Sequence, residues 1–257
     1  MRIKQQTIAF YTLVRRELVR MFRIASQVFL PPVITTALYF LIFGSLVGNR
    51  IGPIQGVSYV MFIAPGLIMM SIITNAYGNV STSLFSVRFQ KSIEEILISP
   101  INNSLLLLGY VFGGILRGVI VAILVFAVSG FFMTLHIHNV MLTVLVVVLV
   151  SAVFSLAGFT NAMLARNFDD VMLVPTFILT PLTYLGGVFY STNMLPPIWQ
   201  TISHFNPILY MVSALRHAMI DQGEVNLTIS MLLICLMLGL LIAMNLMMLK
   251  KGIGMRD

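Results

Sequence analysis

The chain carries very little charge. Only 9% of its 257 residues are Asp, Glu, Lys or Arg, whereas about 25% is usual in a soluble domain. Because so few charges cannot cover a water-facing surface, a soluble globular domain and a disordered chain are excluded. Hydrophobic residues make up 59% of the sequence, and the mean hydropathy is +1.00. This composition indicates a polytopic membrane protein, in which the net charge of +7 reports orientation and not nucleic-acid binding.

Residues for disulfides, metal sites and catalysis are also scarce. Cys235 is the single cysteine, so an intrachain disulfide is excluded. Glycine is nowhere followed by lysine, which excludes the P-loop motif GxxxxGK[ST], and the patterns GxSxG, HExxH and CxxC are absent. We therefore expect no catalytic residue, no metal and no cofactor in this chain.

Six apolar runs are long enough to cross a bilayer. A helix of roughly 20 residues, rising 1.5 Å per residue, crosses about 30 Å of hydrocarbon. The runs cover residues 26–47, 59–80, 105–131, 140–164, 171–190 and 227–249. We expect an all-α protein in which residues 26–257 form one transmembrane domain with six spans. Residues 1–25 precede it as a separate amphipathic helix.

The stretch between the fifth and sixth runs is apolar but interrupted. Pro196-Pro197 and Asn206-Pro207 divide it into pieces of about ten residues, each rising about 15 Å as a helix, or half a bilayer. The pattern favours a re-entrant helical hairpin over residues 193–213. The alternative, an outer loop lying on the bilayer surface, stays open at this point.

The basic residues are distributed unequally between the two sides of these spans. Twelve fall on one side, and the other side has only Arg50 and Arg216. The twelve are Arg2, Lys4, Arg15, Arg16, Arg20, Arg23, Arg88, Lys91, Arg166, Lys250, Lys251 and Arg256. By the positive-inside rule, both termini are expected in the cytoplasm.

Two cytoplasmic segments have helical patterns. In residues 1–25, Arg16, Arg20 and Arg23 share one face opposite an apolar stripe, so we expect them to point toward anionic headgroups. In residues 85–98, apolar residues recur at helical spacing among charged ones, and Pro100 ends the pattern. Such a helix suits the groove of a partner protein, although it could equally lie on the membrane.

Some features inside the spans are unusual. Arg117 lies about 12 residues into the third run, where a charge is costly and normally faces the protein interior. No acidic residue lies in any run, so we expect its partner to be a span end or backbone carbonyl groups. Four glycines of the same run, Gly109, Gly113, Gly114 and Gly118, permit close helix packing. Pro175 and Pro181 predict that the fifth span is kinked.

Four segments of the chain together resemble a known family. They are RREL at residues 15–18, IEEILISP at 93–100, LVPTFILTPLTYLGGVFYS at 173–191 and LPPIWQTISHFNPILYMVSALR at 195–216. In these segments the chain resembles the ABC-2 type transporter permeases, and among them the small bacterial inner-membrane permeases of the YadH type. The resemblance extends over essentially the whole sequence.

The resemblance implies a type V exporter fold and a permease subunit of the bacterial inner membrane. The permease would work as a homodimer with two copies of a separate ATP-binding subunit, which would hold ATP and Mg²⁺. Residues 1–25 would be the connecting helix, and residues 85–98 would be the coupling helix seated in that subunit. The residues expected at this contact are Arg16, Glu17, Arg20, Phe89, Lys91, Glu94, Glu95 and Leu97.

The resemblance also implies a pathway along the dimer axis, closed at its outer end by the re-entrant segment. Expected lining residues are Asn75, Tyr77, Thr180, Thr183 and Tyr184, and the expected gate comprises Pro196, Pro197, Trp199, Asn206 and Pro207. Because few polar residues line this path, a hydrophobic or amphipathic substrate is favoured. The main alternative is an ion-coupled secondary transporter or channel, but its usual buried acidic relays and inverted repeats are not seen.

Overall fold

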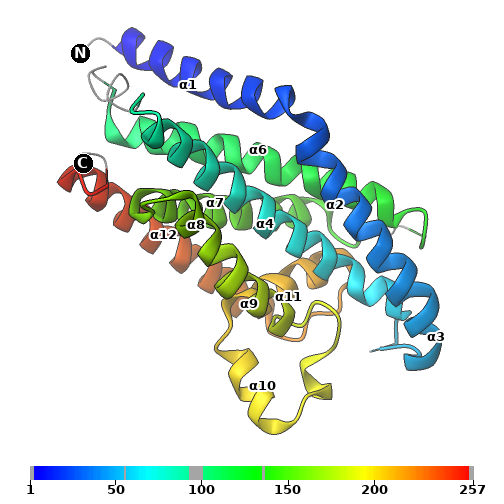
Figure 1. Cartoon of the computed structure of the whole chain (residues 1–257). Helices are drawn as coiled ribbons and strands as arrows, with labels where there is room; N and C mark the ends of the chain where they lie inside the picture. Colours follow the sequence, from blue (N-terminus) through cyan, green and yellow to red (C-terminus); the bar gives the residue numbers. More distant parts are fainter. Residues whose placement is uncertain (1–2, 55, 93–100, 135–136, 255–257) are drawn as a thin grey trace.

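The computed structural model describes residues 3–54, 56–92, 101–134 and 137–254 (Figure 1). Within these ranges the chain is helical, and the isolated bridge between Ile54 and Val57 is the one β-type pairing. The helices are α1 (Ile3–Arg23), α2 (Ala25–Tyr39), the π-helix η1 (Phe40–Val47), α3 (Gly48–Ile51), α4 (Tyr59–Phe89), α6 (Asn103–Ser129), α7 (Val140–Leu164), α8 (Phe168–Leu173), the π-helix η2 (Val174–Leu179), α9 (Thr180–Leu185), the 3₁₀ turn η3 (Thr192–Met194), α10 (Pro197–His204), α11 (Pro207–Ile220) and α12 (Leu227–Lys251).

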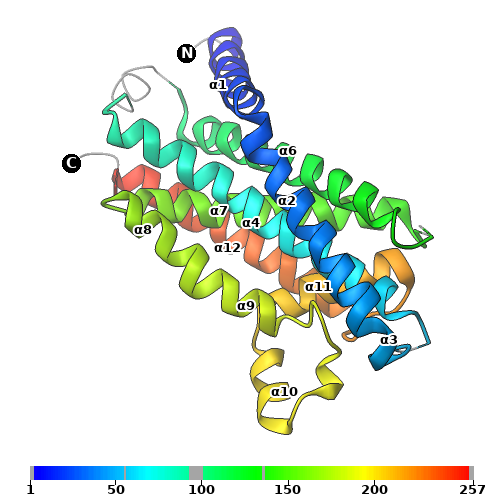
Figure 2. The same ribbon diagram turned by 45° about the vertical axis from the view of Figure 1, so that its right-hand side comes forward.

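Six candidate membrane spans confirm the predicted number. They are Ala25–Gly44, Tyr59–Phe89, Asn103–Ser129, Val140–Leu164, Phe168–Leu185 and Leu227–Lys251. Both termini lie at the same end of the bundle, together with the end of α4 and the start of α6 (Figures 1 and 2). An even number of spans with both ends on one side agrees with the predicted topology.

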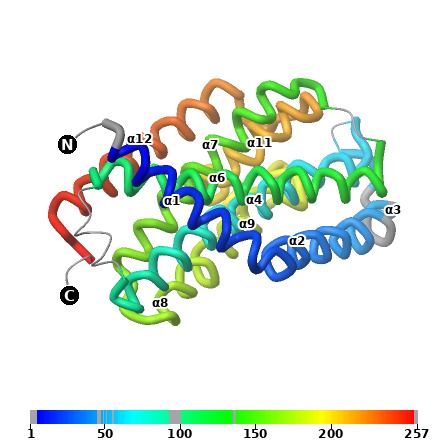
Figure 3. The backbone as a smooth tube through the Cα atoms, turned by 90° about the horizontal axis from the view of Figure 1, so that it is seen from above, coloured from blue at the N-terminus to red at the C-terminus, as the bar shows by residue number. Residues whose placement is uncertain are grey.

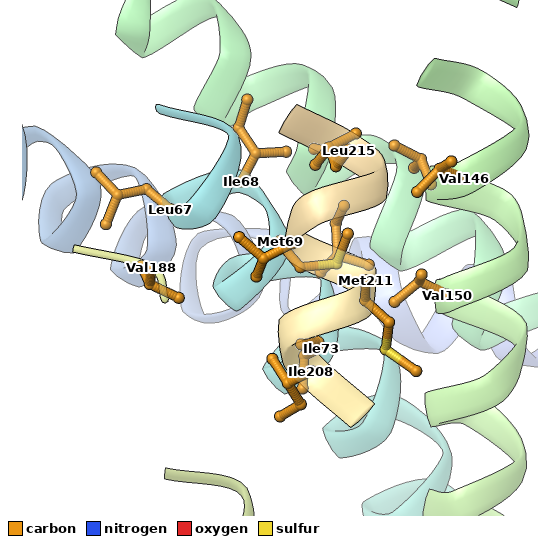
Figure 4. Close-up of a cluster of buried hydrophobic side chains, with 14 of the residues drawn as sticks. Leu67, Ile68, Met69, Ile73, Val146, Val150, Val188, Ile208, Met211 and Leu215 are labelled. Carbon is orange, nitrogen blue, oxygen red and sulfur yellow. The ribbon is translucent and has the colours of Figure 1, made fainter. Parts of the chain in front are cut away.

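α4 forms the centre of the bundle and is the most buried span. It packs against α6 and α7 along its length, while α2 and α12 lie toward opposite edges (Figure 3). Figure 4 shows the core where Ile68 and Met69 of α4 meet Met211 of α11 and Val150 of α7. The first, fifth and sixth spans bury far less of their surface, so their apolar faces are left for lipid or for another protein.

The four glycines of α6 form two separate contact faces. Gly109 and Gly113 lie against Leu13 and Glu17 of α1, whereas Gly114 and Gly118 lie against Ser155 and Ser151 of α7. Each pair is four residues apart, so each presents one face of the helix to a different neighbour. Because these glycines have no side chains, α1 can approach one face of α6 closely and α7 can approach another.

The prolines of the first and fifth spans do not end these helices. Pro31 and Pro32 lie inside α2, which continues into the π-helix η1. The fifth span passes from α8 through the π-helix η2, which contains Pro175, into α9. It ends at Leu185 and not near residue 190, because Gly186 and Gly187, the latter with φ +71°, turn the chain away.

α4 is longer than predicted, which alters the expected coupling helix. Residues 85–89 are not a separate helix but the last turn of α4. The helix stops at Phe89, and Lys91 has a φ of 57°, so a single helix over residues 85–98 is wrong. Residues 93–100, with Glu94, Glu95 and Leu97, lie outside the described residues.

The interrupted stretch forms two helices that meet at Asn206-Pro207, as the prolines predicted. α10 projects from the bundle, whereas α11 returns into the core and continues to Ile220 (Figure 1). The Asn206 side chain accepts a hydrogen bond from the Ile208 backbone N–H at 3.0 Å, which caps α11. α11, the second of the two helices, ends at Ile220 and so extends beyond residue 213, where the hairpin was expected to end.

Replacing Gly158 by Ala should weaken the packing of α7 on α4. A Cβ there would overlap the backbone carbonyl oxygen of Tyr77, which cannot move without shifting α4. Overpacking of this kind costs about 1–3 kcal/mol, so the thermal unfolding midpoint of the purified protein should fall. Gly78→Ala is the matched control, because a Cβ at that position of α4 meets nothing within 4 Å. Equal midpoints for the two variants would contradict this contact.

Candidate functional site

A buried carboxylate holds α1 against the bundle. Glu17 accepts hydrogen bonds from Arg16 at 3.3 Å, from Arg20 at 3.1 Å and from Ser83 of α4 at 2.8 Å. Arg20 also donates to the side-chain oxygen of Asn79 at 2.9 Å. The Glu17 side chain is only 1% exposed, so its charge is neutralised entirely within the protein.

Arg16 joins the same network from α1. Its guanidinium donates to the Tyr110 hydroxyl of α6 at 2.7 Å. Burial alone would lower the pKa of Arg16, but Tyr110 and Glu17 hold this pKa above its ordinary value. Arg16 therefore stays charged at any physiological pH.

This network corrects the expected orientation of two arginines of α1. Arg16 and Arg20 point into the bundle and not toward lipid headgroups, because Gly113 admits Glu17, which attracts both. Glu17 is buried among residues of its own chain, and its contact with an ATP-binding subunit stays a prediction. Arg23 is exposed at the end of α1.

The end of α4 offers a different surface. Phe89 and Lys91 are exposed beside the start of the 93–100 segment. Phe85 and Phe89 pack around Phe168 of α8, with ring centroids 4.8 and 5.0 Å from it. Arg88 donates to backbone carbonyl groups at the end of α7, among them that of Met163 at 3.0 Å. These contacts fasten the end of α4 to α7 and α8.

A groove with polar lining lies between α2, α4 and α6. Its volume is about 270 Å³. It is lined by Gln27, Val28, Pro31, Pro32, Thr35, Thr36, Tyr39, Leu67, Met70, Ser71, Thr74, Asn75 and Arg117. Arg117 donates to the side-chain oxygen of Asn75 from Nε at 3.3 Å and from Nη2 at 3.1 Å. Its partner is therefore a side-chain amide of the neighbouring span, not the span end or backbone carbonyl groups that the sequence suggested.

The expected pathway residues are only partly brought together. Asn75 lines the groove, and the Tyr184 hydroxyl lies 3.3 Å from that of Tyr39, another lining residue. Thr180 is exposed and donates to the Pro175 carbonyl at 2.9 Å. Tyr77 and Thr183 are each 1% exposed in the core of this chain and do not line the groove, so their place on a pathway stays a prediction. They lie on the inner faces of their helices.

Several groove residues were missed by reasoning from the sequence. The polar side chains of the first span line it, and so do Ser71, one turn before Asn75, and Thr74, directly before Asn75. The polar residues in the otherwise apolar first span could have indicated a polar groove. That these residues face Arg117, however, depends on how α2 packs against the other helices.

A second buried arginine lies toward the other end of the bundle. Arg216 of α11 is 0% exposed and pairs with Glu224 at 3.5 Å. It donates to the carbonyl groups of Phe62 at 3.3 Å and Gly187 at 2.8 Å, and its guanidinium lies 3.8 Å from the centroid of the Phe62 ring. Glu224 also accepts from the Thr192 hydroxyl at 2.6 Å. Arg216 therefore cross-links α11, α4 and the turn after α9, and is not the outer-loop residue that charge counting suggested.

The expected gate residues divide between the two helices. Pro196, Pro197 and Trp199 are exposed on or beside α10. Asn206 is buried and donates to the Leu182 carbonyl at 2.6 Å, which fastens the start of α11 to α9. Pro207 begins α11 and is half-buried. In the described ranges, no group of three His, Cys, Asp or Glu residues could hold a metal ion.

Known proteins resemble this chain along most of its length. The family model described as ABC-2 type transporter matches residues 8–220. The inner membrane transport permease YadH of Escherichia coli K12 is 48% identical over 252 residues, covering 97% of this chain and 98% of that protein. Nodulation protein J of Sinorhizobium fredii is 27% identical over 205 residues, covering 77% and 76%, and that of Neorhizobium galegae is 21% identical over 238 residues, covering 92% and 91%.

Glu224→Ala should strongly destabilise the protein, because it leaves the buried Arg216 charge without its counter-charge. Breaking a buried ion pair costs about 3–5 kcal/mol, so we expect a marked fall in the thermal unfolding midpoint in detergent. Asp221→Asn is the control, since Asp221 is 54% exposed beside half-exposed His217 and Asn tolerates the left-handed backbone (φ 56°) at this position. A loss in Asp221→Asn as large as that in Glu224→Ala would contradict the structural role of this pair.

Proposed function

The chain belongs to the ABC-2 type transporter family as a permease component, a multi-pass protein of the inner membrane, and from this membership we propose that two copies of it form an export pathway. Permeases of this family pair with ATP-binding subunits. In the proposed assembly, two copies of such a subunit bind ATP and Mg²⁺ and drive transport of a hydrophobic or amphipathic substrate.

The observation that carries the proposal is the polar groove beside the first span. Polar and charged side chains at membrane depth face protein or a water-filled cavity, because exposure to hydrocarbon costs several kcal/mol per group. The groove sets Gln27, Thr35, Thr74 and Arg117 along an open surface between three spans. A second copy facing this surface would close it into a pathway.

The exposed faces of the first and fifth spans support the same arrangement. Tyr39 and Tyr184 connect these spans at the groove edge. Large apolar side chains are exposed on both spans, including Leu38 on the first and Phe177 on the fifth. In our proposal, two such surfaces meet at the dimer axis, and the exposed α12 faces lipid.

In our proposal, the ATP-binding subunit acts on the end of the bundle where the termini lie. We place this end in the cytoplasm because of its excess of Lys and Arg. The segment after Lys91 contacts the ATP-binding subunit, and α1 transmits the movement, since Glu17 fastens it to α4. The spans then rock as rigid bodies, in a type V exporter arrangement whose outer end is closed by the re-entrant α10 and α11.

The alternative is an ion-coupled transporter or channel. Such proteins carry acidic residues in the spans that bind and release protons or cations. Among the described residues, both buried carboxylates form ion pairs with arginines. Glu17 pairs with Arg16 and Arg20, and Glu224 pairs with Arg216. Family membership together with this lack of a free acid favours the ATP-driven permease.

Cysteine accessibility tests the pathway. The single native cysteine, Cys235, is exposed and is replaced by Ser in the background. Thr74→Cys, at the groove, should react about tenfold faster or more with a membrane-impermeant maleimide than Leu236→Cys on the exposed face of α12. The reason is that a maleimide reacts with the thiolate, which forms only in water. Equal, slow labelling of both positions in membranes would refute a water-filled path at the groove.

Charge reversal tests the contact with the ATP-binding subunit. Replacing Glu94 and Glu95 with Lys should reduce co-purification of that subunit and stimulation of its ATPase activity by about tenfold, through lost electrostatic complementarity. Folding, measured by the unfolding midpoint, should be unchanged. Asp221→Lys reverses an exposed charge outside this segment and serves as the control. Wild-type association in the double variant would refute the coupling assignment.

A further inference from the structure

Arg117 has unused hydrogen-bonding capacity inside the groove. A guanidinium carries five N–H donors. Two of these donors, on Nε and Nη2, share a single acceptor, the side-chain oxygen of Asn75. That oxygen belongs to a neutral amide, so it leaves the positive charge uncompensated.

The described acidic residues do not supply the missing charge. Glu17 is buried, and both of its oxygens already accept hydrogen bonds from Arg16, Arg20 and Ser83. The ion pairs formed by described residues involve Arg16, Arg20, Arg216 and His217, and none involves Arg117.

Arg216 shows what a purely structural arginine looks like in this protein. It is completely buried and has a carboxylate, two backbone carbonyl groups and an aromatic ring as partners. Arg117, by contrast, lines an open groove and has one neutral partner. The difference indicates that the remaining partner of Arg117 comes from outside the chain.

The rest of the groove indicates what kind of molecule would supply it. Hydroxyl groups of Thr36 and Ser71 lie on the same lining as Arg117 and suit an oxyanion, whereas the Thr74 hydroxyl already donates to the Met70 carbonyl at 3.0 Å. Apolar groups of Val28 and Leu67 continue that lining. At about 270 Å³ the groove is smaller than a typical drug-sized site, so it suits a headgroup with its chain extending toward the bilayer.

We propose that this groove binds the phosphate or carboxylate headgroup of an anionic amphipath, with Arg117 as the charge that recognises it. This inference rests on the proposed pathway and specifies its substrate class. Asn75 acts as the positioning residue, since it holds the guanidinium at the groove by two hydrogen bonds. The charge pairing replaces the hydration that both groups lose at membrane depth.

The test is protection of a groove cysteine from labelling. The full chain with Cys235→Ser and Thr74→Cys is placed in phosphatidylcholine nanodiscs, and its maleimide labelling rate is followed while dodecyl phosphate is added. Dodecyl phosphate should slow labelling, whereas dodecylphosphocholine, whose phosphate is neutralised by its choline, and inorganic phosphate should not. Equal protection by dodecyl phosphate and dodecylphosphocholine in this wild-type groove would overturn the proposal without any further variant.

Substitutions then assign the effect to Arg117. Arg117→Gln should raise the half-protecting concentration of dodecyl phosphate about tenfold or more, and Arg117→Lys, which keeps the charge, should raise it less. Arg15→Gln removes the same charge from an exposed position of α1 and should change nothing. Unchanged protection in Arg117→Gln, with a wild-type unfolding midpoint, would overturn the assignment.

The source of the headgroup is decided by changing the bilayer. If nanodiscs containing phosphatidylglycerol protect Thr74→Cys without added amphipath, the groove binds a membrane lipid through this chemistry. If they do not, the anion belongs to a molecule delivered for transport. Rapid labelling with no protection by dodecyl phosphate would refute this inference alone, whereas a groove cysteine that never labels would refute the proposed pathway itself.

Discussion

Close approach of α1 and α7 to the two glycine faces of α6 is the contact on which the rest of the structure depends. Gly113 leaves room for Glu17, and Gly114 and Gly118 leave room for two serines of α7. Without a hydrophobic driving force between helices in lipid, such backbone proximity and the hydrogen bonds it permits are what hold spans together. The seating of α1 in turn brings Arg20 to Asn79 and fixes where the first span starts, which defines the edge of the groove.

Three arginine environments in one apolar chain show how surroundings assign different roles to the same side chain. Arg216 is fully enclosed by a carboxylate, carbonyl groups and a ring, and it serves as a cross-link. Arg20 shares Glu17 and holds a helix to the bundle. Arg117 faces an open groove with only an amide beside it. Because burying a charge without a counter-charge is costly, the last arrangement fits a site that is completed by a ligand.

Several site residues could not be placed from the sequence, because the facing of a helix is set by its neighbours. Tyr77 and Thr183 are polar residues on the right helices, but they point into the core, whereas Thr74 and Asn75 face the groove. Helical periodicity locates residues relative to one another and leaves the rotation of the helix undetermined. The sequence pattern of α1 predicts a helix at the membrane interface, with Glu17 exposed. Glu17 can be buried because Gly113 of α6 leaves room for its side chain.

The sequence by itself determined that the protein is all-helical, that it has six spans and that the stretch before the last span breaks at Asn206-Pro207. These features follow locally, since bilayer thickness, backbone hydrogen bonding and proline geometry act on neighbouring residues. The tertiary structure alone decided that Arg117 meets Asn75, 42 residues away, and that Arg216 meets Phe62, 154 residues away. Such pairs depend on how whole helices rotate and pack, and no local pattern in the chain encodes that choice.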